Sequence, residues 1–153
     1  MNLAITGSSG NIGGMVARHL STRGLPLILP LRNPAKATDL LNCEVRRFAY
    51  GDLELAKQAL NGVDVLFMVS VAESPMREQE HLTLVQAASE AGVKHIVYLS
   101  FAQAALDSTF TLARTHAVTE NAIRQTNMRY TFLRDNFYSE MMATIANADG
   151  IIA

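Results

Sequence analysis

The sequence predicts an α/β fold in which a doubly wound parallel sheet is flanked by helices, and three observations support this prediction. First, short apolar runs alternate along the chain with segments of helical spacing, the pattern of right-handed βαβ units. Second, a glycine-rich turn joins the first apolar run to the first helical segment. Third, the 153 residues contain no internal repeat, low-complexity tract or linker, so we expect one domain spanning 1–153.

Six apolar runs are expected to be strands, because parallel strands that are buried on both faces read as near-continuous apolar sequence. The third run is the weakest of them, since Arg46 and Arg47 interrupt it. The six runs are Leu3–Ile5, Leu25–Leu31, Val45–Ala49, Val65–Val69, His95–Leu99 and Tyr130–Leu133.

Helices are expected between these runs. Over Met76–Ala91, apolar residues recur at i, i+3, i+4 and i+7 from Leu84, which gives the segment one apolar face. Ser74 is expected to cap this helix, with Pro75 at its first turn and Gly92 at its end. Further helices are expected over Leu53–Leu60, capped by Asp52, and over Ser139–Ala146, and residues 151–153 read as the start of another strand.

The composition argues against several classes of protein. Hydrophobic residues make up 49% of the chain and charged residues 18%, a balance that favours a buried core over disorder. The formal net charge is −1 and no run of Lys or Arg stands out, so no nucleic-acid partner is expected. Without a secretory signal pattern, or an apolar run near the ~20 residues that span a bilayer, the chain is expected to be cytoplasmic, with no membrane partner.

The cysteine and histidine residues indicate neither a disulfide nor a metal site. Cys43 is the only cysteine, which excludes an intrachain disulfide and suits a reducing compartment. His19, His81 and His95 show no metal-ligand spacing, and we expect them to be structural.

The glycine-rich turn has the spacing G-x-x-G-x-x-G and follows the very first strand. Small residues there let the backbone turn tightly and approach a pyrophosphate, and a side chain at Gly10 would obstruct that approach. Gly13 would let the following helix, which begins near Asn11, pack close to the sheet and direct its free N–H groups at the phosphates. The alternative is an ordinary glycine-rich turn. The residues expected to bind the cofactor here are Thr6, Gly7, Ser8, Ser9, Gly10, Asn11, Ile12 and Gly13.

The end of the second strand indicates which dinucleotide is preferred. Rossmann domains that bind NAD place an acidic residue there for the ribose 2′-OH, but this chain has Arg32 instead, followed by Lys36. A guanidinium makes charge-assisted contacts to a 2′-phosphate, so we expect NADP(H) to be preferred, with NAD still possible. The alternative is a solvated basic loop.

Three further residues are expected near the cofactor. Asp52 could accept from the adenine amino group with Leu53 against the ring, although Asp52 could also serve only as a helix cap. Ser70 ends the fourth strand at the carboxyl edge of the sheet, where such folds bind ligands, or is simply a strand-ending hydroxyl.

With these residues in view, the chain resembles the NmrA-like group of atypical short-chain dehydrogenases, and most closely its NAD(P)H:quinone oxidoreductases and triphenylmethane reductases. The resemblance rests on the glycine turn and on four further segments. Those segments are Leu31–Pro34, Gly51–Leu53, Gly92–Tyr98 and the stretch Thr115–Arg124 running into Tyr130–Tyr138. It implies that the C-terminal part of the family's fold, the last sheet strand and most of a small substrate lobe, is absent from this chain.

The Tyr-x-x-x-Lys pair that short-chain dehydrogenases commonly use is missing, and His116 stands where many relatives place the lysine. We expect His116 to bond the nicotinamide ribose or to lie beside an acceptor oxygen, where a near-neutral pKa would let it give a proton. The alternative is an ordinary surface pair with Glu120, four residues further along the helix.

By the same resemblance, Asn136, Phe137 and Tyr138 wall the substrate pocket, with the aromatic rings stacking on a flat acceptor. Alternatively, Phe137 and Tyr138 pack against the helix that follows them.

The sequence thus favours an NADPH-dependent oxidoreductase that passes hydride to a small quinone or similar dye, and it leaves open a homodimer. The rival is a non-enzymatic NAD(P)-binding redox sensor of the NmrA type, which the missing Tyr-x-x-x-Lys pair favours slightly. A third reading is that the chain is only a nucleotide module.

Overall fold

A single six-stranded sheet forms the centre of the computed structural model, which describes residues 1–139. All neighbouring strands are parallel, and their order is β3-β2-β1-β4-β5-β6. The strands are β1 (Leu3–Ile5), β2 (Leu27–Leu31), β3 (Cys43–Arg47), β4 (Val65–Met68), β5 (His95–Phe101) and β6 (Arg129–Asp135). This order is that of dinucleotide-binding Rossmann folds, so the predicted fold class is confirmed.

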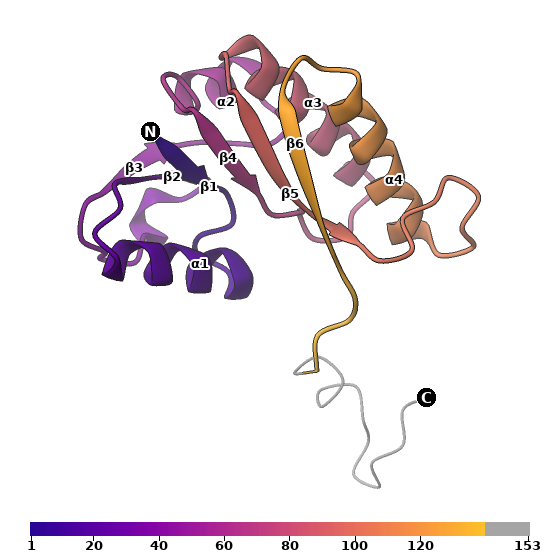
Figure 1. Ribbon diagram of the computed structural model, residues 1–153, viewed down its shortest axis with the longest axis horizontal. Helices are drawn as coiled ribbons and strands as arrows, with labels where there is room; N and C mark the ends of the chain where they lie inside the picture. The colour runs from indigo at the N-terminus through magenta and orange to yellow at the C-terminus, as the bar shows by residue number, and fades with distance from the viewer. Residues whose placement is uncertain (140–153) are drawn as a thin grey trace, which may run out of the picture.

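Helices cover the two faces of the sheet unequally. Helix α1 (Asn11–Thr22) packs on one face, and α2 (Leu53–Ala59), α3 (Arg77–Glu90) and α4 (Thr111–Arg124) lie side by side on the other (Figure 1). Alternate strand residues serve the two sides: Ala4 joins the larger core cluster under α2–α4, whereas Ile5 joins the smaller cluster under α1. This alternation follows from the two-residue period of a strand.

The connection between β1 and the strands on either side fixes where a ligand can bind. From β1 the chain runs outward to β2 and β3, then returns to place β4 on the other side of β1. The chain leaves β1 for α1 and leaves β4 for α3, which lie on opposite faces of the sheet, and such folds bind ligands at the carboxyl edge beside this switch in direction. The candidate site lies at this edge.

Several predicted boundaries differ from the structure, and two of the differences have a clear physical reason. Strand β3 begins at Cys43 and ends at Arg47, two residues earlier than the predicted Val45–Ala49, because it is an edge strand with an exposed side, on which Arg46 pairs with Glu44. The predicted cap Ser74 is wrong. Helix α3 begins at Arg77, and Ser74 accepts the Arg77 N–H with its carbonyl oxygen and not with its side chain.

Two predicted helix ends are confirmed. Asp52 caps α2, accepting the Leu55 N–H at 3.0 Å, and Gly92 follows α3 with a φ of 78°. The predicted helix Ser139–Ala146 lies outside the described residues except for Ser139, and the predicted strand start at 151–153 lies wholly outside them. No helix within residues 1–139 is both long and apolar enough to cross a membrane.

Candidate nucleotide and acceptor site

The glycine turn brings the end of β1, the start of α1 and the end of β4 into close contact. Gly7 has a φ of 65°, and a Cβ there would lie 3.1 Å from the Cβ of Val69. A Cβ at Gly13 would lie 2.4 Å from the Gly7 carbonyl oxygen and 2.7 Å from that of Thr6, closer than real Cβ atoms come. Gly13 is therefore the residue that lets α1 pack over the end of β1. Gly10 is less restricted, since its Cβ would lie 3.3 Å from the Gly7 oxygen.

The amino end of α1 is open to an anion. Its first i→i−4 bond runs from the Gly14 N–H to the Gly10 carbonyl oxygen at 3.0 Å, so the preceding N–H groups have no partner within the helix. No side chain caps this end, and its first turn carries no acidic residue. Within residues 1–139, the Ser8 Oγ is the buried side-chain oxygen or nitrogen that lacks a hydrogen-bond partner. These groups fit a cofactor phosphate, which would accept from them.

The basic residues after β2 face solvent. Arg32 and Lys36 are exposed, and within the described part of the chain Arg32 makes no ion pair or side-chain hydrogen bond. Between them the Asn33 side chain accepts the Ala35 N–H at 3.0 Å, which fixes the short 3₁₀ turn η1 (Pro34–Lys36). Both cations are thus available at the carboxyl edge.

The residues expected near the adenine have structural roles in this fold. The Asp52 carboxylate caps α2, as the alternative reading held, and Leu53 packs against the larger core cluster. Neither contact excludes a further contact with the adenine.

A pocket of about 250 Å³ opens at the same edge, beyond β4. It brings together five residues that the sequence singled out from three distant segments: Ser70, His116, Asn136, Phe137 and Tyr138. Its other lining residues are Ala72, Glu73, Arg77, Leu99, Phe101, Phe110, Leu112 and Asp135.

Aromatic rings form one wall of this pocket. The rings of Phe101, Phe110 and Phe137 lie 5.6–5.8 Å apart, centroid to centroid, and the His116 ring stacks on Phe101 at 6.1 Å. Phe137 is 49% exposed, so a flat ligand can reach it. The Tyr138 hydroxyl donates to Asp135, and burial together with that carboxylate raises the pKa of Tyr138.

His116 is neither a surface residue nor a ready acid. It is buried, and burial, with Arg77 beside it, lowers the pKa of His116 to about 4. An Arg77 N–H donates to Nε2 at 3.0 Å, so the proton of the neutral ring is on Nδ1, which donates to the Tyr98 hydroxyl oxygen at 2.8 Å. The expectation of a near-neutral pKa is therefore wrong. The alternative of a surface pair is wrong too, because Glu120 is also buried and binds other partners.

A second buried histidine completes this cluster. The Val71 N–H donates to His81 Nε2 at 3.1 Å, and His81 Nδ1 donates to Thr119 Oγ1 at 3.0 Å. Arg77 meanwhile donates to the Val71 carbonyl oxygen. Both backbone groups of Val71, in the loop after β4, are therefore held by side chains of α3. Burial lowers the pKa of His81 to about 3, which keeps its ring neutral and supports the structural role predicted for it.

Glu120 anchors α4 to the last two strands. Its carboxylate is 1% exposed and accepts from Ser100 Oγ at 2.7 Å, from Arg124 at 2.9 Å and from two nitrogens of Arg134 at 2.7 and 2.9 Å. Burial acts to raise the pKa of Glu120, but the bonds from Arg134 and Ser100 outweigh it and lower the pKa. Ser100 is thereby committed to the structure rather than to a ligand.

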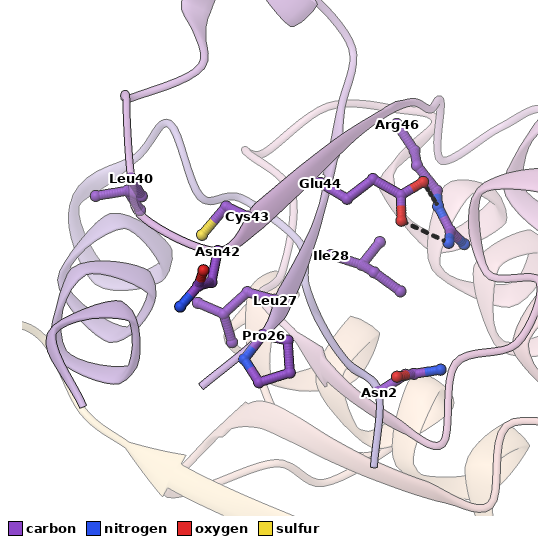
Figure 2. Close-up of a pocket in the computed structure, with 9 residues that line it drawn as sticks. All are labelled: Asn2, Pro26, Leu27, Ile28, Leu40, Asn42, Cys43, Glu44 and Arg46. Carbon is purple, nitrogen blue, oxygen red and sulfur yellow. Dashed lines mark hydrogen bonds and ion pairs between the residues drawn. The ribbon is translucent and has the colours of Figure 1, made fainter. Parts of the chain in front are cut away.

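A larger pocket of about 380 Å³ lies at the opposite edge of the sheet, where β2 and β3 begin (Figure 2). Its charged residues Glu44 and Arg46 pair with each other, and Arg46 also donates to two backbone carbonyl groups. This pocket is far from the glycine turn, so we assign the functional site to the smaller pocket. Within residues 1–139, no three His, Cys, Asp or Glu side chains gather in a way that could hold a metal ion.

The class of protein follows from the strand order, the glycine turn and the open end of α1 taken together. Residues 7–147 match the family model described as NAD(P)H-binding, and the chain belongs to this family.

Individual relatives are reductases. The chain is 37% identical to quinone oxidoreductase 2 of Escherichia coli over 90% of this chain and 49% of that protein. It is 32% identical to an NAD(P)H azoreductase of Xenophilus azovorans, over 95% of this chain and 51% of that protein. The structure of Citrobacter triphenylmethane reductase complexed with NADP(H) is similar, with a TM-score of 0.84 and 38% identity, over 91% of this chain and 51% of that chain.

The chain therefore spans about half the length of the curated relatives it matches. The comparisons confirm the family resemblance and the nicotinamide class of cofactor predicted from the sequence. Sequence reasoning missed Arg77, Phe101 and Tyr98 as neighbours of the site.

Proposed function

We propose that this chain is the nucleotide-binding part of an NADPH-dependent oxidoreductase that transfers hydride to a small flat acceptor of the quinone or dye class. One observation carries the proposal: the glycine turn and the aromatic pocket adjoin. Gly7 lies against Val69, and the next residue, Ser70, lines the pocket. A dinucleotide whose phosphates lie on the turn would extend past Ser70 toward that pocket.

The residues present fit such a cofactor. The open end of α1 and the Ser8 hydroxyl offer donors to the pyrophosphate, and Arg32 with Lys36 offers cations to a 2′-phosphate. This is the basis for preferring NADPH over NADH. When bound, the nicotinamide supplies the hydride, and the protein's task is to hold the acceptor against it.

The pocket residues take roles that follow from their contacts. The rings of Phe101, Phe110 and Phe137 offer a surface for a planar acceptor. His116 acts as a positioning residue, because both of its nitrogens are bonded to protein groups and its ring is neutral. Water supplies the proton that completes a quinol, since a quinone accepts hydride readily.

The decisive experiment is to mix the purified protein with NADPH, with and without 1,4-benzoquinone, and to follow the absorbance of the reduced nicotinamide. We expect oxidation that depends on the acceptor and requires neither added flavin nor added metal. Tight NADPH binding without oxidation, across several quinones and dyes, would overturn the proposal.

A non-enzymatic redox sensor is the second candidate, and the state of His116 favours it. The Tyr-x-x-x-Lys pair is missing, and within residues 1–139 the proton of His116 is bonded to Tyr98, so neither group offers a proton to the acceptor. If the benzoquinone assay shows no turnover, the next measurement is whether NADPH and NADP⁺ bind with different affinities, as a sensor requires.

A further inference from the structure

Arg77 places a buried positive charge in the lining of the acceptor pocket. Its side chain lines the pocket although the residue is only 5% exposed. Within residues 1–139, no carboxylate lies within ion-pair distance of it. A guanidinium has five N–H donors, and three of them are used, by the Val71 carbonyl oxygen, Thr115 Oγ1 and His116 Nε2. Two N–H groups of Arg77 are therefore left to donate to a ligand, and its positive charge is not neutralised by an ion pair.

The carboxylates of the pocket do not cancel this charge. Glu73 attracts the guanidinium, but it is exposed, so water and salt screen this attraction, and Asp135 accepts from Tyr138. The buried guanidinium acts through a less polar medium, in which charges interact more strongly. The pocket lining thus combines one buried cation with two carboxylates that are more exposed to solvent.

We propose that Arg77 selects acceptors by charge: the site reduces neutral carbonyl acceptors, which become oxyanions on accepting hydride, in preference to cationic dyes, which become neutral. This inference rests on the proposed function and names the substrate class of that site. The carrying observation is the buried guanidinium, without a carboxylate partner, beside the aromatic wall.

The chemistry of the two classes differs at this position. With a quinone, hydride leaves the reduced nicotinamide, which is oxidised, and bonds to the quinone, which is reduced to a hydroquinone monoanion. The two free N–H groups of Arg77 donate to the oxygen on which the negative charge develops, and water then protonates it. With a triarylmethyl cation, hydride neutralises the central carbon, so no negative charge develops and the guanidinium only repels the substrate.

The test compares Arg77→Gln and Arg77→Lys with the wild type, using 1,4-benzoquinone and the cationic dye crystal violet at saturating NADPH. For Arg77→Gln we expect kcat/KM for the quinone to fall by roughly 10–100-fold, the value of one charge-assisted bond, while kcat/KM for the dye does not fall. Arg77→Lys should restore part of the quinone activity. Arg114→Gln is the matched control, because Arg114 also bonds backbone carbonyl groups nearby but does not line the pocket.

An equal loss for both acceptors would mean that Arg77 only holds the Val71 loop and His116 in place, and it would overturn the inference. Circular dichroism shows whether each variant is folded.

A binding measurement decides the inference even if no acceptor is reduced. The phenolate of 4-nitrophenol stands in for the hydroquinone monoanion, and it absorbs separately from the phenol. Bound to the wild-type protein with NADP⁺, it should titrate at a lower pH than in water, and bound to Arg77→Gln it should not. A probe whose titration is unchanged by the wild-type pocket contradicts the role of Arg77. If the titration of the bound probe shifts but NADPH is not oxidised, the interaction of Arg77 with the phenolate stands, and only the proposed hydride transfer is rejected.

Discussion

The glycine turn and the polar cluster around Val71 both lie at the carboxyl edge of the sheet, yet they are constructed by different means. The turn is made of backbone from one short segment, and its geometry depends on the missing Cβ of Gly13. The cluster is made of side chains from three elements: Arg77 and His81 on α3, Tyr98 on β5 and His116 on α4. The glycine turn should therefore be disrupted by added side-chain atoms. The polar cluster should be disrupted by protonation of its histidines or by loss of the charge of Arg77.

The largest effect is expected at the turn. Gly13→Ala puts a Cβ 2.4 Å from backbone atoms that cannot move without shifting β1 or α1. We expect a loss of stability beyond the ~1–3 kcal/mol usual for overpacking, measured by urea unfolding, together with loss of NADPH binding. Gly51→Ala is the matched control, because its Cβ would make only an ordinary contact with Glu80 at 3.7 Å. A stable Gly13→Ala protein would show that the turn can relax.

The polar cluster should instead respond to acid. The pKa values of His81 and His116 are lowered to about 3 and about 4, mainly by burial, from 6.5. Because the unfolded chain then takes up protons first, the stability that these neutral rings contribute is present above pH 6.5 and is lost as the pH falls toward the folded pKa values. At ~1.4 kcal/mol per unit for each group, we expect a loss of roughly 3 kcal/mol between pH 6.5 and about pH 5.

Urea unfolding at a series of pH values measures this loss. His81→Gln should flatten the profile, whereas the Gly51→Ala control should follow the wild type. A His81→Gln protein that keeps the full wild-type slope would contradict the role assigned to this ring.

The next effect concerns the ionic anchor of α4. Glu120→Gln removes the charge that binds Arg134, Arg124 and Ser100, and we expect a loss of ~2 kcal/mol in the free energy of unfolding at neutral pH. This is less than for a wholly buried pair, since both arginines are partly exposed and water can solvate them. Because the pKa of Glu120 is lowered from 4.5, the difference from the wild type should shrink as the pH falls below about 4.5. Glu54→Gln, on the exposed surface, should cost little.

Substitution of Arg32 should change ligand binding without changing stability. Arg32→Ala should weaken NADPH binding by roughly 10–100-fold, as expected for one charge-assisted bond, and should weaken NADH binding far less. Because Arg32 is exposed and its side chain makes no hydrogen bond or ion pair within residues 1–139, the thermal stability of the Arg32→Ala protein should match that of the wild type. Fluorescence titration with both nucleotides measures the effect, and equal losses for the two would reject the 2′-phosphate contact.

The smallest effect is expected at the aromatic wall. Phe137→Ala removes a ring that contacts Phe101 and Phe110, and stacking contacts of this kind contribute ~0.5–1.5 kcal/mol. We expect a several-fold rise in the quinone KM with kcat nearly unchanged, because the ring is used equally in the ground and transition states. A fall in kcat alone would place Phe137 in the chemistry rather than in binding.

The same contrast explains what could be predicted from the sequence. The turn is contiguous in the sequence, so the spacing of Gly7, Gly10 and Gly13 is enough to predict it. The six strands could be predicted from apolar runs because both faces of the sheet are covered near its centre. Strand β3 was misplaced since an edge strand does not need an apolar run.

The cluster could not be found in this way, because its members are 17 to 39 residues apart from one element to the next. One signal was available for α3: Arg77 and His81 are in phase with Leu84 and Ala88, so polar residues occupy a predicted core stripe. Polar residues at core positions must find partners, and that requirement points to a buried network. A similar signal exists on α4, because His116 is in phase with Ala113 and Ile123, but helical phase alone does not tell how strongly burial lowers the pKa of the ring.

The hydrogen bonds from His81 and Arg77 to the backbone of Val71 affect how ligands bind. Loops at binding sites are commonly ordered only when the ligand arrives, and ordering a residue's backbone costs ~1–2 kcal/mol of conformational entropy. Here the N–H and carbonyl groups of Val71 are already fixed by His81 and Arg77, and Tyr50 fixes the Val69 carbonyl group. The loop beside the pocket is thus preorganised, and the Val71 amide should exchange with deuterium as slowly as one in a core strand.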